Sequence, residues 1–97
     1  VPGAVSGWWL LHQRHGKLPW AALFEPAIAM AEAGVPVPPV IAYYMAAGVR
    51  NLRRTDRGIE ETANALRTFA PGGEAPKEGE VFRNPDLART YRLIAEG

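Results

Sequence analysis

Closely spaced glycines and prolines set the strongest limit on the fold of this chain. Ten glycines and nine prolines divide 97 residues into short segments rich in Ala, Leu, Glu and Arg. Glycine and proline interrupt regular structure, whereas the residues between them favour helices. Runs that alternate apolar and polar residues, as half-buried strands do, are nearly absent. The sequence therefore predicts an all-α fold of four to five helices, in a chain long enough for one domain at most.

The breaks give approximate bounds for these helices. Helices are expected over residues 4–15, 20–33, 39–54, 59–68 and 85–96, with a Pro/Gly-rich loop over 70–83. The second helix should break at Pro26 into a short helical turn over 20–25 and a helix from Pro26 to Ala33, because an interior proline removes a hydrogen bond and costs ~3 kcal/mol. Gly16 and Gly34 suit helix ends, with Gly16 expected in the left-handed C′ position. Residues 35–39 contain three prolines, so an extended connection is expected there.

Apolar residues of the first helix form a wide stripe. One side carries residues at i, i+3 and i+4 spacing, namely Val5, Trp8, Leu11, His12 and His15. Trp9 and Leu10 extend this stripe toward a second face. Of the 11 basic and 10 acidic side chains, only five lie in residues 1–50, which are expected to pack against something apolar. The sequence therefore predicts a first helix that is covered on more than one side.

The three later helices each have a predicted apolar face. These faces contain Ile41, Tyr44, Met45 and Gly48 in the first of them, Ala63, Leu66 and Phe69 in the next, and Leu87, Tyr91, Ile94 and Ala95 in the last. Asn84 is predicted as the N-cap of the last helix, with Pro85 at its first position. Asp86 then lies favourably beside the positive end of the helix dipole.

Composition excludes several classes of site. The chain has no cysteine, which excludes disulfides, thiolate zinc sites and a cysteine nucleophile. Its net charge of +1 gives no general attraction to nucleic acid or to membranes. No apolar run approaches the ~18 residues that a membrane span needs, and no signal-peptide pattern is visible. The residues thus predict no membrane or nucleic-acid partner and leave the compartment open.

His12 and His15 are the pair of side chains with metal-ligand spacing. They lie one helical turn apart, and two histidines so placed can share a metal ion. A third ligand is missing, because no Asp, Glu or Cys lies one further turn along that face. Both are interpreted as structural residues near an aromatic core, and neither a metal nor another cofactor is predicted.

The charged residues give no convergent site. A basic stripe at one helix end contains Arg50, Arg53, Arg54 and Arg57. Such a stripe can bind phosphates or carboxylates, but more often it is a solvated helix end that complements the negative end of the helix dipole. Glu60 and Glu61 point to different sides of a predicted helix, whereas catalytic carboxylate pairs converge. A nucleic-acid binder that uses the basic stripe is kept as a minor alternative.

The hydroxyl residues lack the pattern of an activated nucleophile. They are Ser6, Thr55, Thr62, Thr68 and Thr90. None has an adjacent base in sequence, and Ser6 does not lie in a strand–turn–helix elbow. Gly72-Gly73 lacks the Lys-Ser/Thr of a phosphate-binding loop. Trp8, Trp9 and Trp20 are better explained by core packing than by stacking on a ligand.

Three stretches carry ordered motifs of a known family. The first, VPGAVSGWWLLHQRHGKLPWAALFEPAIAMAEAGVPV, contains V-P-G, then G-x-L-P-W, then P-A-I-x-x-A-x-x-G-x-x-V. The second, FAPGGEAPKEGEVFRNPDLART, contains F-x-P-x-G-x-x-P-x-x-G-x-x-x-x-N-P-D-L-A-x-T, and YRLIAEG continues it. In this order and spacing they resemble the γ-glutamyltransferase family (γ-glutamyltranspeptidase or glutathione hydrolase) over nearly the whole chain, most weakly over residues 39–68.

The resemblance implies a fold and a chemistry. Such enzymes are αββα N-terminal nucleophile hydrolases, whose precursor cleaves itself into a large and a small subunit. The new amino-terminal Thr attacks the γ-glutamyl amide of glutathione, and water or an acceptor amino acid or peptide takes the acyl group. The resemblance places this chain as one excised helical segment, residues 1–97, inside the large subunit. It also implies a periplasmic or secreted location in bacteria.

The resemblance also implies where the site residues lie. The nucleophile Thr and the oxyanion Gly-Gly pair belong to the small subunit, and the Arg that holds the substrate carboxylate lies upstream of the V-P-G motif. No catalytic, substrate-binding or metal residue is therefore carried over to this chain. Its expected partners are the rest of the large subunit and the small subunit, with self-association through exposed apolar surface. The isolated residues are predicted to be inactive, and a stand-alone helical interaction module is the alternative.

Overall fold

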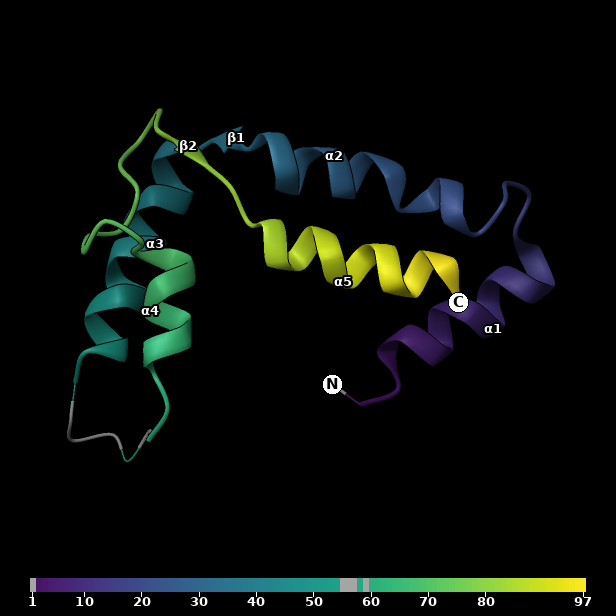
Figure 1. Cartoon of the computed structure of the whole chain (residues 1–97), viewed down its shortest axis with the longest axis horizontal. Coiled ribbons are helices and arrows are strands. Elements are labelled where there is room, and N and C mark those ends of the chain that lie inside the picture. Colours follow the sequence, from purple (N-terminus) through teal and green to yellow (C-terminus); the bar gives the residue numbers. More distant parts are fainter. Residues whose placement is uncertain (1, 55–57, 59) are drawn as a thin grey trace. The chain divides into compact units, whose positions relative to one another are not determined.

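The computed structural model describes residues 2–54, 58 and 60–97 of the chain (Figure 1). In order, these residues form α1 (Ala4–His15), the 3₁₀ helix η1 (Ala21–Leu23), α2 (Glu25–Ala33), β1 (Val35–Pro36), α3 (Pro39–Leu52), α4 (Ala63–Phe69), β2 (Val81–Phe82) and α5 (Pro85–Glu96). They cluster into two compact units. The first unit is Val1–Glu32 with Pro85–Gly97, and the second unit is Ala33–Asn84. No helix of the described residues has the length and apolarity required to cross a membrane.

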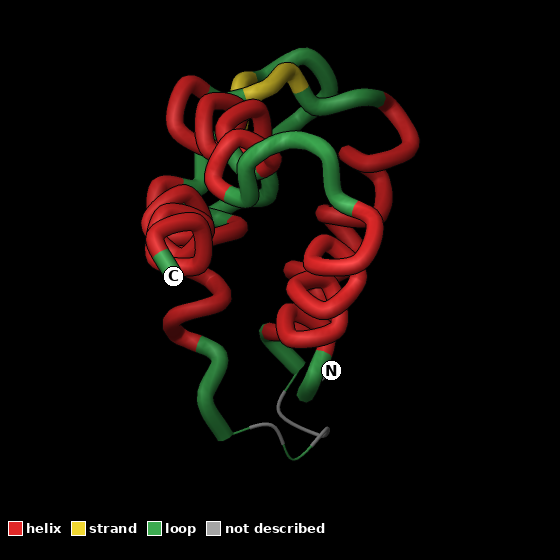
Figure 2. The backbone as a smooth tube through the Cα atoms, turned by 90° about the vertical axis from the view of Figure 1, so that its right-hand side faces the viewer, coloured by secondary structure: helices red, strands yellow, loops and turns green. Residues whose placement is uncertain are grey.

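The helical prediction is correct in outline, but an all-α fold omits a small sheet. β1 pairs with β2 in antiparallel fashion, with Val35 opposite Phe82 and Pro36 opposite Val81 (Figure 2). The ladder continues past the strands, since the Val37 N–H donates to the Glu80 carbonyl at 3.0 Å. The extended connection and part of the predicted 70–83 loop therefore form strands. Two-residue strands are too short to show an alternating pattern, and their pairing joins residues far apart in sequence.

In the first unit, Trp20 and Phe24 connect η1 to α5. The Trp20 indole N–H donates to the Ile94 carbonyl at 2.9 Å. Phe24 is buried and lies between Trp20 and Tyr91, with ring centroids 4.9 and 6.0 Å away. An Arg92–Glu32 ion pair joins α5 to α2, and Figure 1 shows these two helices side by side. The buried face of α5 is centred on Ala88, whereas Leu87 is 39% exposed.

The predicted break in the second helix lies at Phe24, two residues before Pro26. Phe24 donates its N–H to the Ala21 carbonyl and so closes the 3₁₀ turn. Pro26 is the second residue of α2, in the first turn, where a missing N–H removes no intrahelical bond. The Phe24 carbonyl instead accepts from the Ile28 N–H at 2.9 Å. Proline therefore begins the helix here, and the expected end at residue 33 agrees with α2.

Gly16 ends α1 for a different reason from the one predicted. Its φ of −66° and ψ of 143° are extended, so the left-handed C′ prediction is wrong. A Cβ at this position would lie 2.5 Å from the His12 carbonyl oxygen and closer still to the imidazole ring. Glycine is required here because the chain turns back tightly over His12. Gly34 lies at the predicted helix end, and there the backbone is left-handed, with φ of +91°.

The second unit contains α3, α4 and the strands. The sequence predicts a helix from residue 59, yet α4 begins at Ala63, and residue 59 lies outside the described part. The Glu61 carboxylate accepts from the Asn64 N–H at 3.2 Å, which helps to start the helix there. Glu60 and Glu61 therefore precede a helix instead of lying on one. At the other end of α4, Phe69 stacks on Phe82 with centroids 6.0 Å apart.

The inward face of α3 also differs from the prediction. Ile41 and Tyr44 are 51% and 65% exposed, whereas Val49 is 3% exposed and Ala42 and Ala46 are half-buried. Ala42, Ala46 and Val49 instead line a hollow that they share with residues 74–78 of the same unit. Sequence periodicity gives the spacing of a face, and the neighbouring elements select which of two adjacent apolar faces turns inward.

The described residues bury little apolar surface. Their buried hydrophobic residues are Phe24, Val37, Val49, Ala70 and Ala88. No large side chain among them is fully buried, and many large apolar side chains are at least 39% exposed. The exposed large apolar side chains are most frequent on α1 and α3.

Candidate functional site

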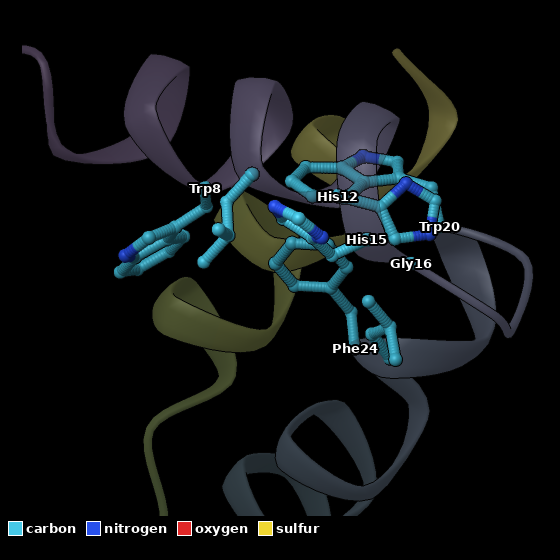
Figure 3. Close-up of a pocket in the computed structure, with 8 residues that line it drawn as sticks. Trp8, His12, His15, Gly16, Trp20 and Phe24 are labelled. Atoms are coloured by element: carbon cyan, nitrogen blue, oxygen red, sulfur yellow. The ribbon is translucent and has the colours of Figure 1, made fainter.

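An apolar hollow of the first unit lies between α1 and the Trp20–Phe24 turn. It has a volume of about 480 Å³. Its walls are Trp8, Leu11, His12, His15, Gly16, Trp20, Leu23 and Phe24, and Figure 3 shows them. This volume falls within the range of ordinary ligand clefts. We call this hollow the α1 cleft. Four of its walls belong to the stripe that the sequence predicts on the first helix.

Aromatic rings make one end of the α1 cleft rigid. Trp20 meets Trp9 edge-on at 5.1 Å and Phe24 edge-on at 4.9 Å. His12 lies 5.4 Å from Trp20 and 6.3 Å from Trp9. Such pairs are worth ~0.5–1.5 kcal/mol each beyond burial of their area. Trp20 thus packs among rings at the half-buried end of the cleft, whereas Trp9 meets its edge while 45% exposed, so Trp9 is not a core residue. Trp8 lies apart from these rings, on the other side of the cleft (Figure 3).

His12 has one ring nitrogen satisfied and one without a partner. Its Nε2 lies 2.7 Å from the Leu18 carbonyl oxygen. A carbonyl can only accept, so Nε2 carries the hydrogen and donates. In the neutral ring Nδ1 then keeps a lone pair, and this atom is buried without a hydrogen-bond partner among the described residues. Leaving such an acceptor unpaired costs ~1–3 kcal/mol.

The described geometry gives His12 a hydrogen bond to the backbone and two ring contacts. His15 is exposed and lines the same cleft. Within residues 2–54, 58 and 60–97, no group of three His, Cys, Asp or Glu side chains is placed to hold a metal ion. His12 also holds the chain at Leu18, a role that sequence spacing did not indicate.

Three described hydroxyl groups make local bonds to backbone carbonyls three or four residues earlier. Ser6 donates to the Gly3 carbonyl at 2.9 Å, Thr68 to Asn64 at 3.0 Å and Thr90 to Asp86 at 3.1 Å. Thr62 occupies the N-cap position of α4, and Thr55 lies outside the described residues. An activated nucleophile needs a base within hydrogen-bond reach. These three bonds lead to backbone carbonyls, which cannot act as that base.

The basic stripe does not form a simple anion site. Arg53 donates to the Gly73 carbonyl, and Arg57 lies outside the described residues. Arg50 and Arg53 line a hollow of the second unit that also contains Glu74 and Glu78. Acidic and basic groups thus share this surface, which weakens any attraction for phosphate. Gly73 forms a turn, with φ of +94° and an N–H bonded to the Ala70 carbonyl.

Curated relatives match almost the whole chain. Human glutathione hydrolase 5 proenzyme is 47% identical over 95 residues, which are 98% of this chain and 15% of the relative. Glutathione hydrolase 2 of Arabidopsis thaliana is 38% identical over 96 residues, which are 99% of this chain and 15% of the relative. The chain thus spans 15% of the length of each of these proteins.

A solved structure has the same fold over this region. The crystal structure of a cephalosporin acylase from Bacillus halodurans superposes with a TM-score of 0.89 at 43% sequence identity. The match covers 99% of this chain and 18% of the acylase chain. The family model for gamma-glutamyltranspeptidase matches residues 1–97. This chain therefore belongs to the γ-glutamyltranspeptidase family.

Proposed function

We propose that these 97 residues are a structural segment of the large subunit of an enzyme that resembles γ-glutamyltransferase. The observation that carries this proposal is that residues 1–97 all match the family model. The same residues cover only 15% of the length of the two glutathione hydrolase relatives. The bonds of Ser6, Thr68 and Thr90 add support, since they lead to helix carbonyls and not to a base. In this proposal the chain supplies no catalytic or substrate-binding residue.

The whole enzyme would cleave a γ-glutamyl amide in two acyl transfers. The Thr hydroxyl, activated by its own α-amine, attacks the carbonyl carbon and forms an ester while the C–N bond breaks. The departing amine takes the proton from the hydroxyl. Water or an acceptor amine then attacks the ester and regenerates the Thr. Glutathione is the proposed donor, because the human and Arabidopsis relatives are named glutathione hydrolases.

The test compares this chain with the longer protein that contains it, on a γ-glutamyl anilide. We expect anilide release by the matured longer protein and none above background by the 97 residues. Heating the longer protein before the assay is the control for spontaneous hydrolysis. Turnover by the 97 residues alone contradicts the structural role, and an inactive but correctly cleaved longer protein contradicts the proposed substrate.

The second candidate is a stand-alone helical interaction module derived from the same family. The exposure of large apolar side chains such as Trp8, Leu11 and Tyr44 favours it, since a module would use them to bind a partner. The natural gene product separates the two proposals. A native protein close to 97 residues long supports the module, whereas a product several-fold longer supports the enzyme segment.

A further inference from the structure

The second unit has a hollow of its own, between α3 and residues 74–78. It has a volume of about 470 Å³, which falls within the range of ordinary ligand clefts. We call it the α3 hollow. Its apolar walls are small and at least half-buried, namely Ala42, Ala46 and Val49 on α3 and Ala75 and Pro76 opposite them. Small side chains leave room here for the body of a small molecule.

The wall that faces α3 is fixed at both of its ends. At one end Arg53 of α3 donates to the Gly73 carbonyl. At the other end the Gly79 N–H donates to the Val37 carbonyl at 2.9 Å, beside the small sheet. Residues 74–78 are therefore held before any ligand arrives. A wall held in this way loses less conformational freedom on binding than a free loop does.

Charged groups of both signs line the α3 hollow without pairing. Arg50 and Lys77 are the cations that Arg53 leaves available, and Glu74 and Glu78 are the anions. Within the described part of the chain, no ion pair joins either cation to either glutamate. A ligand that carries a carboxylate and an ammonium group can satisfy both signs at once, through charge-assisted hydrogen bonds.

The separation of these charges favours a short peptide over other small molecules. A simple anion such as phosphate would be repelled by Glu74 and Glu78, and a simple cation by Arg50. A free amino acid has both charges on one carbon atom, whereas a dipeptide holds them apart by a peptide link. The dipeptide therefore suits charged groups that lie too far apart to pair with each other. Small apolar side chains would match the alanine-lined walls.

We propose that the α3 hollow binds a short free peptide with small apolar side chains. The carboxylate of the peptide pairs with Arg50, and its amino terminus pairs with Glu74 or Glu78. All these residues belong to the second unit of this chain. The peptide site therefore does not depend on the proposed function.

Chemical modification of arginine tests this site in the longer protein. Phenylglyoxal modifies exposed arginines, and mass spectrometry of the resulting peptides gives the rate at each one. At a concentration of alanyl-alanine about ten times its dissociation constant, only about a tenth of the sites stay empty, so modification of Arg50 should slow about tenfold. Arg67 is exposed on α4 and does not line the hollow, so its rate should not change.

Two blocked peptides and one variant test whether the peptide bridges the two signs. N-acetyl-alanyl-alanine lacks the ammonium group and alanyl-alanine amide lacks the carboxylate, so each should need a several-fold higher concentration for the same protection. In a protein with both Glu74→Gln and Glu78→Gln, alanyl-alanine should protect Arg50 much less.

Equal protection by all three peptides, or full protection in the glutamine variant, overturns the proposal. An Arg50 that alanyl-alanine does not protect overturns it as well, and so does an Arg50 that fails to react without peptide, because the hollow is then closed. Release of the anilide decides the proposed function separately, since protection of Arg50 is measured without turnover.

Discussion

At the scale of single residues, local crowding accounts for features that composition leaves ambiguous. Gly16 looks like a helix-ending glycine, yet its backbone is extended and its importance comes from the nearby His12 carbonyl. His12 looks like half of a metal site, yet its Nε2 holds the Leu18 carbonyl. Both roles depend on the chain folding back over the end of α1. That fold-back is a tertiary property, so the spacing of residues in the sequence does not reveal why Gly16 is a glycine or that His12 bonds to Leu18.

Replacing Gly16 tests the crowding directly. Gly16→Ala should lower the free energy of unfolding by about 1–3 kcal/mol, because the added Cβ forces His12 to move. The control is Gly7→Ala in the same helix, where a Cβ meets nothing within 4 Å. Alanine should stabilise that position by ~0.5–1 kcal/mol. Urea unfolding of both variants is the measurement, and equal effects contradict the crowding argument.

Two substitutions test the hydrogen bond from His12 to Leu18, because the glutamine and asparagine amides reach the places of Nε2 and Nδ1, respectively. His12→Gln retains an N–H near the place of Nε2 and should lose only the ring contacts with Trp9 and Trp20. His12→Asn loses the same ring contacts and is also too short to reach Leu18, so it should cost about 0.5–1.5 kcal/mol more than the glutamine variant, the worth of a net hydrogen bond. Thermal unfolding followed by circular dichroism compares the two. If the asparagine variant is the more stable one, the Leu18 bond does not hold the turn.

At the scale of elements, short segments far apart in sequence hold each unit together. Trp20 joins η1 to α5 through a hydrogen bond that spans 74 residues. Gly34 allows β1 to approach β2, since it has φ of +91° and lies against Phe82 and Arg83. Neither helix propensity nor periodicity describes such contacts. They explain how a chain with few buried side chains keeps a defined arrangement within each unit.

Removing the Trp20 indole N–H should loosen α5. Trp20→Phe keeps an aromatic ring near Trp9 and Phe24 but leaves the Ile94 carbonyl without this donor. We expect a loss of about 1–3 kcal/mol from the hydrogen bond and the reduced packing. Trp8→Phe, at a half-exposed position of the free chain, is the control and should cost less. Amide hydrogen exchange in α5 should accelerate only in the Trp20 variant.

Gly34 gives a test of the small sheet. Gly34→Ala combines a left-handed backbone with a Cβ 2.8 Å from the Arg83 side chain and 3.0 Å from the Phe82 carbonyl. We expect a cost of about 1–3 kcal/mol and faster exchange of the Val37 amide. Gly72→Ala, where a Cβ meets nothing within 4 Å, is the control for a loop glycine. An undisturbed Val37 amide in the Gly34 variant would show that the sheet tolerates the change.

At the scale of the whole molecule, exposed apolar surface predicts association of the isolated chain. Large side chains of α1 and α3, among them Leu10, Leu11, Val40 and Tyr43, are 62–67% exposed. Burying such surface is favourable at roughly 25 cal/mol per Å². We therefore expect the sedimentation coefficient of the 97 residues to rise with concentration. The longer protein should show no such rise over the same range, and a chain that stays monomeric contradicts the prediction.

The order and spacing of sequence motifs indicate the family. Caps, prolines and helix periodicity act within a few residues, so they indicate the positions of α1, α2, α3 and α5. Long-range packing settles that β1 pairs with β2, which face of α3 turns inward and why Gly16 is a glycine. These features depend on partners distant in the chain, such as Phe82 for Val35, or on how the chain folds back over itself. The α1 cleft depends on both kinds of information. Sequence periodicity predicts the apolar stripe on α1, and the folded turn at Trp20–Phe24 supplies the opposite wall.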